Sequence, residues 1–227
     1  MSVEFCVVSI GALSHNRLWG EAAPVRTAHA TTTLVCEDKR MVLVDPSLPA
    51  AALSARFNER TGKHLSAVTD VFCTTLRPVH RRSIEAMPKA NWWCSEPELE
   101  SYRDYLAGLR GSADRLGTDD LAALEADLRL IERFRPAPEQ FGRQIGQYPL
   151  AGPSPGCAGL LLSPATTTII IAGDAALTVE HVRRGQVWEG CTDTEKALGS
   201  LEDLLELADV IVPGHDNVTV APRQQWF

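Results

Sequence analysis

Four short segments of ligand-type and turn-forming residues most constrain how this 227-residue chain can fold. The first, residues 74–80, reads Thr-Thr-Leu-Arg-Pro-Val-His and lies between an apolar, strand-like run (68–73) and a helix-like run (81–87). The others lie at residues 152–157, 172–175 and 212–216. Loops at the ends of buried strands are where folds built on sheets place their ligand sites. The pattern therefore predicts that His80, Asp174 and His215 meet in one pocket.

The composition favours one globular domain over residues 1–227, because 44% of the chain is hydrophobic and its length suits a single core. The net charge of −7 argues against a nucleic-acid partner, which would require clustered Lys and Arg. The sequence holds no segment near the ~20 apolar residues that span a bilayer, so no membrane partner is expected. Glu4 stands where a signal peptide would carry basic residues, so the start is interpreted as a first strand.

Six cysteines are scattered along the chain without a CxxC pair. This distribution favours free thiols in a reducing cytoplasm over a disulfide framework. Cys157 differs from the buried-strand cysteines because it follows a Pro-Gly turn. The sequence is also compatible with a homodimer and leaves the oligomeric state open.

Strands and helices are expected in two halves, each with strands followed by helices. This order predicts an α/β fold of the αββα type, a four-layer sandwich in which two mixed β-sheets are covered by helices on their outer faces. The expected strands are residues 3–10, 30–36, 40–44, 68–73 and 91–94 in the first half, and 158–163, 167–172 and 210–212 in the second. The polar residues 37–39 predict a hairpin turn.

Helical spacing of apolar residues predicts helices over residues 96–133, with a break at Gly117 and an N-cap at Thr118 or Asp119. A last helix is expected over residues 192–208, capped by Thr192 or Thr194. Residues 134–148, which contain two prolines and a glycine, are interpreted as a connection into the second sheet.

In their order and flanking residues, the four segments resemble those of the metallo-β-lactamase-fold hydrolases. The first loop of that family reads THxHxDH. Matched position by position, this chain has Thr75, Arg77 and Val79 where the family has metal ligands, and only His80 is kept. Cys157 stands at the position of the family's next histidine. Asp174 matches the carboxylate that bridges two metal ions, and His215 matches the last histidine.

The resemblance implies that a two-metal centre is lost and that one site survives. His80, Asp174 and His215 would hold one divalent transition metal, either Zn²⁺, Fe²⁺ or Mn²⁺. Cys157 is a candidate fourth ligand, because thiolates favour zinc. Arg77 would place a fixed cation where the first metal ion would lie, paired with Asp174. The alternative is a metal-free network of the same side chains around the guanidinium.

The long polar insertion at residues 11–28 is a second candidate for function, because loops of this length in compact domains are often functional. In the resembled family this loop overhangs the metal site, which makes His15, Asn16, Trp19 and Arg26 pocket candidates. The alternative is an extended hairpin with an exposed tryptophan. Asp45 would inherit the family's role of orienting the metal loop, or would simply form a turn.

Three remaining histidines are expected outside the chemistry. His29 is interpreted as a hydrogen-bonded structural residue at a strand start, with a position facing the pocket as the alternative. His64 is interpreted as part of a solvated turn and His181 as part of an external helix or turn.

The favoured hypothesis is a single-metal hydrolase of a small ester, thioester or amide, in which water attacks, Asp174 or a neighbouring group acts as base and Arg77 polarises an anionic group of the substrate. The second is a protein without catalytic activity that binds a small anion through Arg77. The third is a thiol enzyme that uses Cys157 with His80 or His215 as base.

Overall fold

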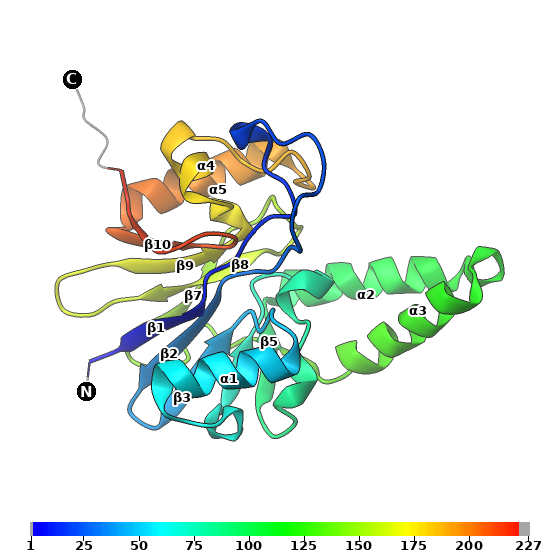
Figure 1. Ribbon diagram of the computed structural model, residues 1–227, viewed down its shortest axis with the longest axis horizontal. Helices are drawn as coiled ribbons and strands as arrows, with labels where there is room; N and C mark the ends of the chain where they lie inside the picture. Colours follow the sequence, from blue (N-terminus) through cyan, green and yellow to red (C-terminus); the bar gives the residue numbers. More distant parts are fainter. Residues whose placement is uncertain (1, 223–227) are drawn as a thin grey trace.

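The computed structural model describes residues 2–222 and contains two β-sheets packed face to face (Figure 1). The first sheet has the order β1-β2-β3-β4-β5-β6 and the second β11-β10-β9-β8-β7. The strands of the first sheet are β1 (Glu4–Ser9), β2 (Thr32–Glu37), β3 (Arg40–Val44), β4 (Asp70–Phe72), β5 (Asn91–Cys94) and β6 (Phe134–Pro136). Those of the second are β7 (Ile145–Pro149), β8 (Ala158–Leu162), β9 (Ile169–Gly173), β10 (Val210–Pro213) and β11 (Thr219–Val220).

Both sheets are mixed. In the first, β1, β2 and β3 pair antiparallel and the strands from β3 to β6 pair parallel. In the second, β9 and β10 run parallel and the other neighbours antiparallel. The predicted hairpin at residues 37–39 is confirmed, since Glu37 pairs with Arg40 across the turn.

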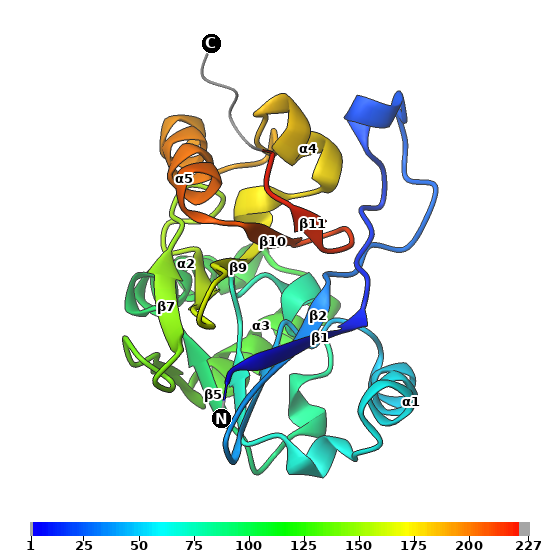
Figure 2. The same cartoon turned by 90° about the vertical axis from the view of Figure 1, so that its left-hand side faces the viewer.

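Helices cover the outer face of each sheet, as the views in Figures 1 and 2 show. The helices that cover the first sheet are α1 (Ala50–Thr61), α2 (Glu96–Arg110) and α3 (Thr118–Ile131). Those that cover the second are α4 (Val179–Arg184) and α5 (Thr194–Leu207). In Figure 1, α2 and α3 extend from the body of the molecule as a helical hairpin.

The strands separate three apolar cores by simple alternation, because successive side chains of a strand point to opposite faces. On β3, Val42 and Val44 pack into the core between the sheets, whereas Leu43 faces the layer of α1, α2 and α3. On β9, Ile169 and Ile171 face the same central core, whereas Ile170 packs against α4 and α5. Three cores between four layers confirm the predicted αββα sandwich.

Several local predictions differ from the structure. Helix α1 was not predicted, although Leu53 and Phe57 form a buried i, i+4 pair on it. The segment interpreted as a connection contains β6 and most of β7. Residues 81–87 contain a short 3₁₀ turn, Ile84–Ala86, where a helix-like run was expected. The caps of α3 and α5 are Gly117 and Asp193.

Within residues 2–222, no helix combines the length and the apolar character needed to cross a membrane.

Candidate functional site

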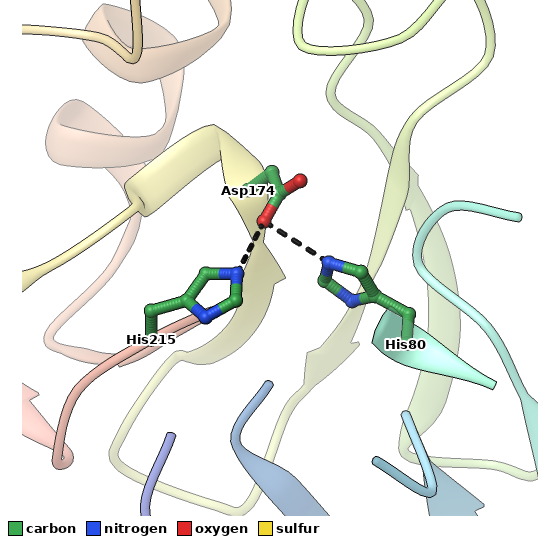
Figure 3. A group of neighbouring side chains, drawn as sticks. All are labelled: His80, Asp174 and His215. Carbon is green, nitrogen blue, oxygen red and sulfur yellow. Dashed lines mark hydrogen bonds and ion pairs between the residues drawn. The ribbon is translucent and has the colours of Figure 1, made fainter. Parts of the chain in front are cut away.

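His80, Asp174 and His215 form a buried cluster whose ligand atoms all lie within 4.8 Å of one another (Figure 3). Nε2 of His80 lies 3.1 Å from Oδ1 of Asp174, and Nε2 of His215 lies 3.2 Å from the same oxygen. The two imidazole rings meet edge to face, with their centroids 5.6 Å apart. The three residues that the sequence predicted to meet in one pocket therefore lie together.

The cluster joins the two sheets. His80 ends the 3₁₀ turn Pro78–His80, which follows β4 of the first sheet, and proline suits the first position of such a turn. Asp174 directly follows β9 and His215 follows β10, both in the second sheet. Gly173 allows the close approach, because its φ is +54° and a Cβ there would lie 2.3 Å from Oγ1 of Thr74.

Each imidazole is held from behind through its other ring nitrogen. Nδ1 of His80 lies 3.0 Å from Oδ2 of Asp45, a carboxylate that also accepts hydrogen bonds from the backbone N–H and the hydroxyl of Thr74. Nδ1 of His215 donates to the carbonyl oxygen of His29 at 3.0 Å. Carboxylate or carbonyl partners of this kind fix the orientation of histidines that bind metals.

Asp45 and His29 thus act through the histidines beside them. Asp45 adopts a left-handed backbone conformation, with φ at +50°, which is unusual for a residue other than glycine. The ring of His29 bonds backbone carbonyl groups at Ile10 and Thr27, which is the structural environment expected for it.

The electrostatics of the cluster favour a charged imidazole when no metal is bound. Burial alone would lower the pKa of His80, but the attraction of Asp174 and Asp45 and their hydrogen bonds raise it to about 10. Burial likewise opposes ionisation of Asp174, but its contacts with His80 and His215 hold the pKa of that carboxyl well below its usual value. His80 then donates from both ring nitrogens to carboxylates.

Arg77 completes this network. Its Nη1 donates to Oδ2 of Asp174 at 2.7 Å, and its Nη2 donates to the carbonyl oxygen of Pro153. The guanidinium carbon lies 4.4 Å from the ring centroid of Trp188, which is a cation–π contact. The cation therefore lies beside the carboxylate that the sequence assigned to it, with 27% of its side chain exposed.

The other residues at ligand positions of the motif lie elsewhere. The hydroxyl of Thr75 bonds Glu98, and Val79 lines the cavity that opens beside the cluster. Cys157 lies in the apolar core beneath α4 and α5, outside the group of potential ligands that the described residues form. Burial raises the pKa of its thiol well above the usual value, so the thiol stays protonated near neutral pH.

Glu98, on α2, is a buried carboxylate that the sequence analysis did not single out. Its Oε1 accepts from the hydroxyl of Thr75 and the backbone N–H of Leu76, and its Oε2 accepts from the hydroxyl of Ser154 and the backbone N–H of Gly156. One carboxylate thereby ties the first loop of the site to the second. Its spacing from the N-cap Ser95 fits the Ser-x-x-Glu pattern of a helix start, but that pattern does not indicate its burial between two loops.

A cavity of about 190 Å³ opens beside the cluster and is lined by Arg77, Asp174 and His215. The insertion at residues 11–28 contributes His15 and Asn16 to its wall, as expected, whereas Trp19 and Arg26 stack on each other and do not line it. His181 also lines the cavity and is 4% exposed. His181 lies on the outer helix α4, as expected, but its side chain is buried on the inner side of that helix and lines the cavity.

The donor set fits one divalent transition metal. Around tetrahedral zinc, ligand atoms at ~2.0–2.1 Å from the ion lie roughly 3.3 Å from one another. The distances of 3.1 and 3.2 Å from each Nε2 to Oδ1 of Asp174 are close to that spacing. Two imidazoles and a carboxylate also suit Fe²⁺ or Mn²⁺.

Comparisons with known proteins agree with the fold. No protein-family model matches this chain, and no curated protein matches its sequence. Among solved structures, a Thermotoga maritima protein provisionally assigned to the metallo-β-lactamases has a TM-score of 0.70 at 15% identity, over 97% of this chain and 100% of its own. AiiA of B. thuringiensis, with N-decanoyl-L-homoserine bound at its active site, has a TM-score of 0.62 at 17% identity, over 95% and 94% of the two chains.

AidC, a dizinc quorum-quenching lactonase, has a TM-score of 0.60 at 16% identity, over 78% of this chain and 67% of its own. At these identities the likeness concerns the fold. The chain has the metallo-β-lactamase fold.

Proposed function

We propose that this protein is a single-metal hydrolase of small esters, thioesters or amides, with His80, Asp174 and His215 as the metal ligands. The observation that carries the proposal is the arrangement of the two imidazoles. Each has its Nδ1 bound to an oxygen behind it and its Nε2 directed at one oxygen of Asp174. A purely structural pair of histidines does not require this matched orientation.

A divalent ion in this cluster would supply a water of lowered pKa as the nucleophile. The side chains of this protein would supply the surrounding charge. Arg77 would hold a cation beside Asp174 at the position where the motif of the family places a ligand of the first metal. Its guanidinium, at the wall of the cavity, would polarise the carbonyl or a charged group of the substrate.

The substrate class is supported by the neighbours of the fold and by the cavity. AidC, a lactonase, was solved with its product N-hexanoyl-L-homoserine, and an AiiA mutant with N-decanoyl-L-homoserine bound at its active site. Lactones, which are cyclic esters, are therefore natural first probes. A cavity of about 190 Å³ suits a small molecule. Cys157 is not favoured as a nucleophile, because its thiol is buried and protonated.

Metal analysis of protein purified without chelator tests this proposal. We expect up to one Zn, Fe or Mn per chain, and we expect His215→Ala to abolish it because two protein ligands would remain. His64→Ala, at an exposed histidine outside the site, is the matched control and should keep the metal. Metal that persists in His215→Ala would place the ion elsewhere, and two ions per chain would contradict a single site.

A second candidate is a metal-free protein that binds a small anion. The observation that favours it is the charge balance of the cluster, in which the carboxylates of Asp45 and Asp174 face the cations of His80 and Arg77. This candidate predicts no bound metal and binding of acetate or phosphate that is lost in Arg77→Gln. Metal-dependent hydrolysis of an ester by the wild type would exclude it.

A further inference from the structure

His181 is a buried imidazole in the wall of the cavity that the proposed function does not yet use. It lies on α4, seven positions after Asp174, and shares the cavity with Arg77, Asp174 and His215. Hydrogen bonds from His215 N–H to Leu177 and from Val179 N–H to Asp216 tie the start of α4 to the loop of His215. These two hydrogen bonds, one to a backbone carbonyl and one to the Asp216 carboxylate, fix the position of α4 and of His181 relative to the cluster.

Thr178 determines which nitrogen of His181 carries the proton. Its hydroxyl oxygen lies 2.7 Å from Nδ1 of His181 and accepts, at 3.4 Å, from the backbone N–H of the same residue. Thr178 is completely buried, so its O–H proton needs an acceptor. The contacts that the described residues give it leave Nδ1 as that acceptor, which puts the proton of the neutral imidazole on Nε2.

The environment keeps this imidazole neutral. Burial lowers the pKa of His181 below its usual value, against the opposing effect of Glu189 and Glu180 and with a small contribution from Arg184. Within the described part of the chain, no protein atom forms a hydrogen bond with Nε2 of His181. This nitrogen is also not fully enclosed by protein atoms. An N–H donor is therefore available to a molecule in the cavity.

Asp174 has no free polar atom with which to engage a molecule in the cavity. Its Oδ1 faces both Nε2 atoms and its Oδ2 accepts from Arg77, so both oxygens are occupied. Nε2 of His181 is thus a polar atom of a residue in the cavity wall that no described residue engages.

We propose that His181 is a further catalytic residue, whose Nε2–H donates a hydrogen bond to the carbonyl oxygen of an ester substrate. As water adds to the carbonyl carbon, the carbonyl oxygen gains negative charge. A fixed donor in a buried site therefore stabilises the transition state more than the ground state. No proton leaves His181 in this step. The inference rests on the proposed function, since it assigns a partner to the substrate of that reaction.

The first test does not need activity. In ¹⁵N-histidine-labelled protein near neutral pH, NMR should show His181 as a neutral imidazole protonated on Nε2, with its signals assigned by their loss in His181→Phe. Thr178→Val should shift the proton toward Nδ1, and Thr178→Ser, which keeps the hydroxyl, should restore the wild-type spectrum. A wild-type His181 that is doubly protonated, or protonated on Nδ1, would overturn the inference.

The second test uses a short p-nitrophenyl ester and a small lactone as probes. We expect His181→Phe to lower kcat by about 10²–10³-fold, as loss of one such donor does in other hydrolases, with KM and metal content little changed. His181→Gln, which keeps an N–H donor, should recover part of kcat. An unchanged kcat in His181→Phe would overturn this inference alone, whereas wild-type protein with neither metal nor activity would overturn the proposed function and this inference with it.

Discussion

Arg77 is the residue whose replacement should reveal most about the charge of the cluster. Arg77→Gln removes the cation beside Asp174, a carboxylate that is 4% exposed. We expect the free energy of unfolding to fall by about 1.5–3 kcal/mol, reduced toward the lower value by partial solvent screening of Arg77. Urea denaturation measures this free energy. Arg17→Gln is the control. It breaks an ion pair with Glu189 in which the two side chains are 69% and 47% exposed, so it should lower the free energy of unfolding by under ~1 kcal/mol. Equal losses in the two variants would contradict a special role for Arg77.

Restoring the residues of the family's motif tests the same position in the opposite direction. The combined change Thr75→His, Arg77→His, Val79→Asp and Cys157→His supplies the missing ligands, so we expect metal stoichiometry to rise from one toward two. The control keeps Arg77 and carries the other three changes, and it should stay at one because a fixed guanidinium repels a second dication. Equal stoichiometry in both variants would mean that Arg77 does not exclude the second ion. Elemental analysis of the purified variants gives the answer.

At the scale of elements, α2 is tied to two loops through Glu98. Glu98→Ala leaves the four donors around that carboxylate without their partner, and each unsatisfied buried group costs about 1–3 kcal/mol, so a fall in the thermal midpoint well beyond that of a surface change is expected. Glu96→Gln, an exposed glutamate in the same first turn, should leave the midpoint nearly unchanged. A small effect in both variants would show that the loops hold their positions without α2.

The sequence predicted those elements whose pattern is carried by their own residues. Strands β3, β9 and β10 are short apolar runs that end in polar loops, so their buried character and the residues after them could be read directly. Strand β6 is three residues long at the edge of its sheet and ends in proline, and its pairing with β5 decides its structure. Local composition carries no information on such a pairing.

The same distinction holds in the site. His80, Asp174 and His215 were found because they match spaced motif positions. Glu98 and His181 depend on which helix face meets the loops, and this follows from packing of the layers rather than from any local pattern. Their roles became visible through burial and hydrogen-bond partners.

For the whole molecule, the cluster predicts how stability depends on pH when no metal is bound. The folded state holds the His80 proton up to about pH 10, against 6.5 for an ordinary histidine. The contribution of this proton to the stability of the fold is therefore complete below pH 6.5 and is lost as pH rises toward about 10. For Asp174, whose pKa is lowered, the contribution is present above pH 3.8 and is lost on acidification.

Thermal unfolding of the metal-free protein checks this expectation. The midpoint should fall between pH 6.5 and about 10, and His80→Gln should have a lower midpoint near neutral pH and a smaller fall over the same interval. Metal binding at Nε2 of His80 competes with that proton, so affinity for Zn²⁺ should increase with pH. A wild-type midpoint that is flat across the interval would contradict the charged state of His80.

The cluster bridges the two sheets, so the docking of the sheets during folding can be followed through proton uptake by His80. His80 follows a strand of the first sheet and Asp174 follows a strand of the second, so the contact between them cannot form before the two sheets dock. Near pH 8 an unfolded chain has a neutral His80, and docking draws a proton from the solvent. A pH-indicator dye mixed with refolding protein would therefore record the moment at which the two halves of the molecule meet.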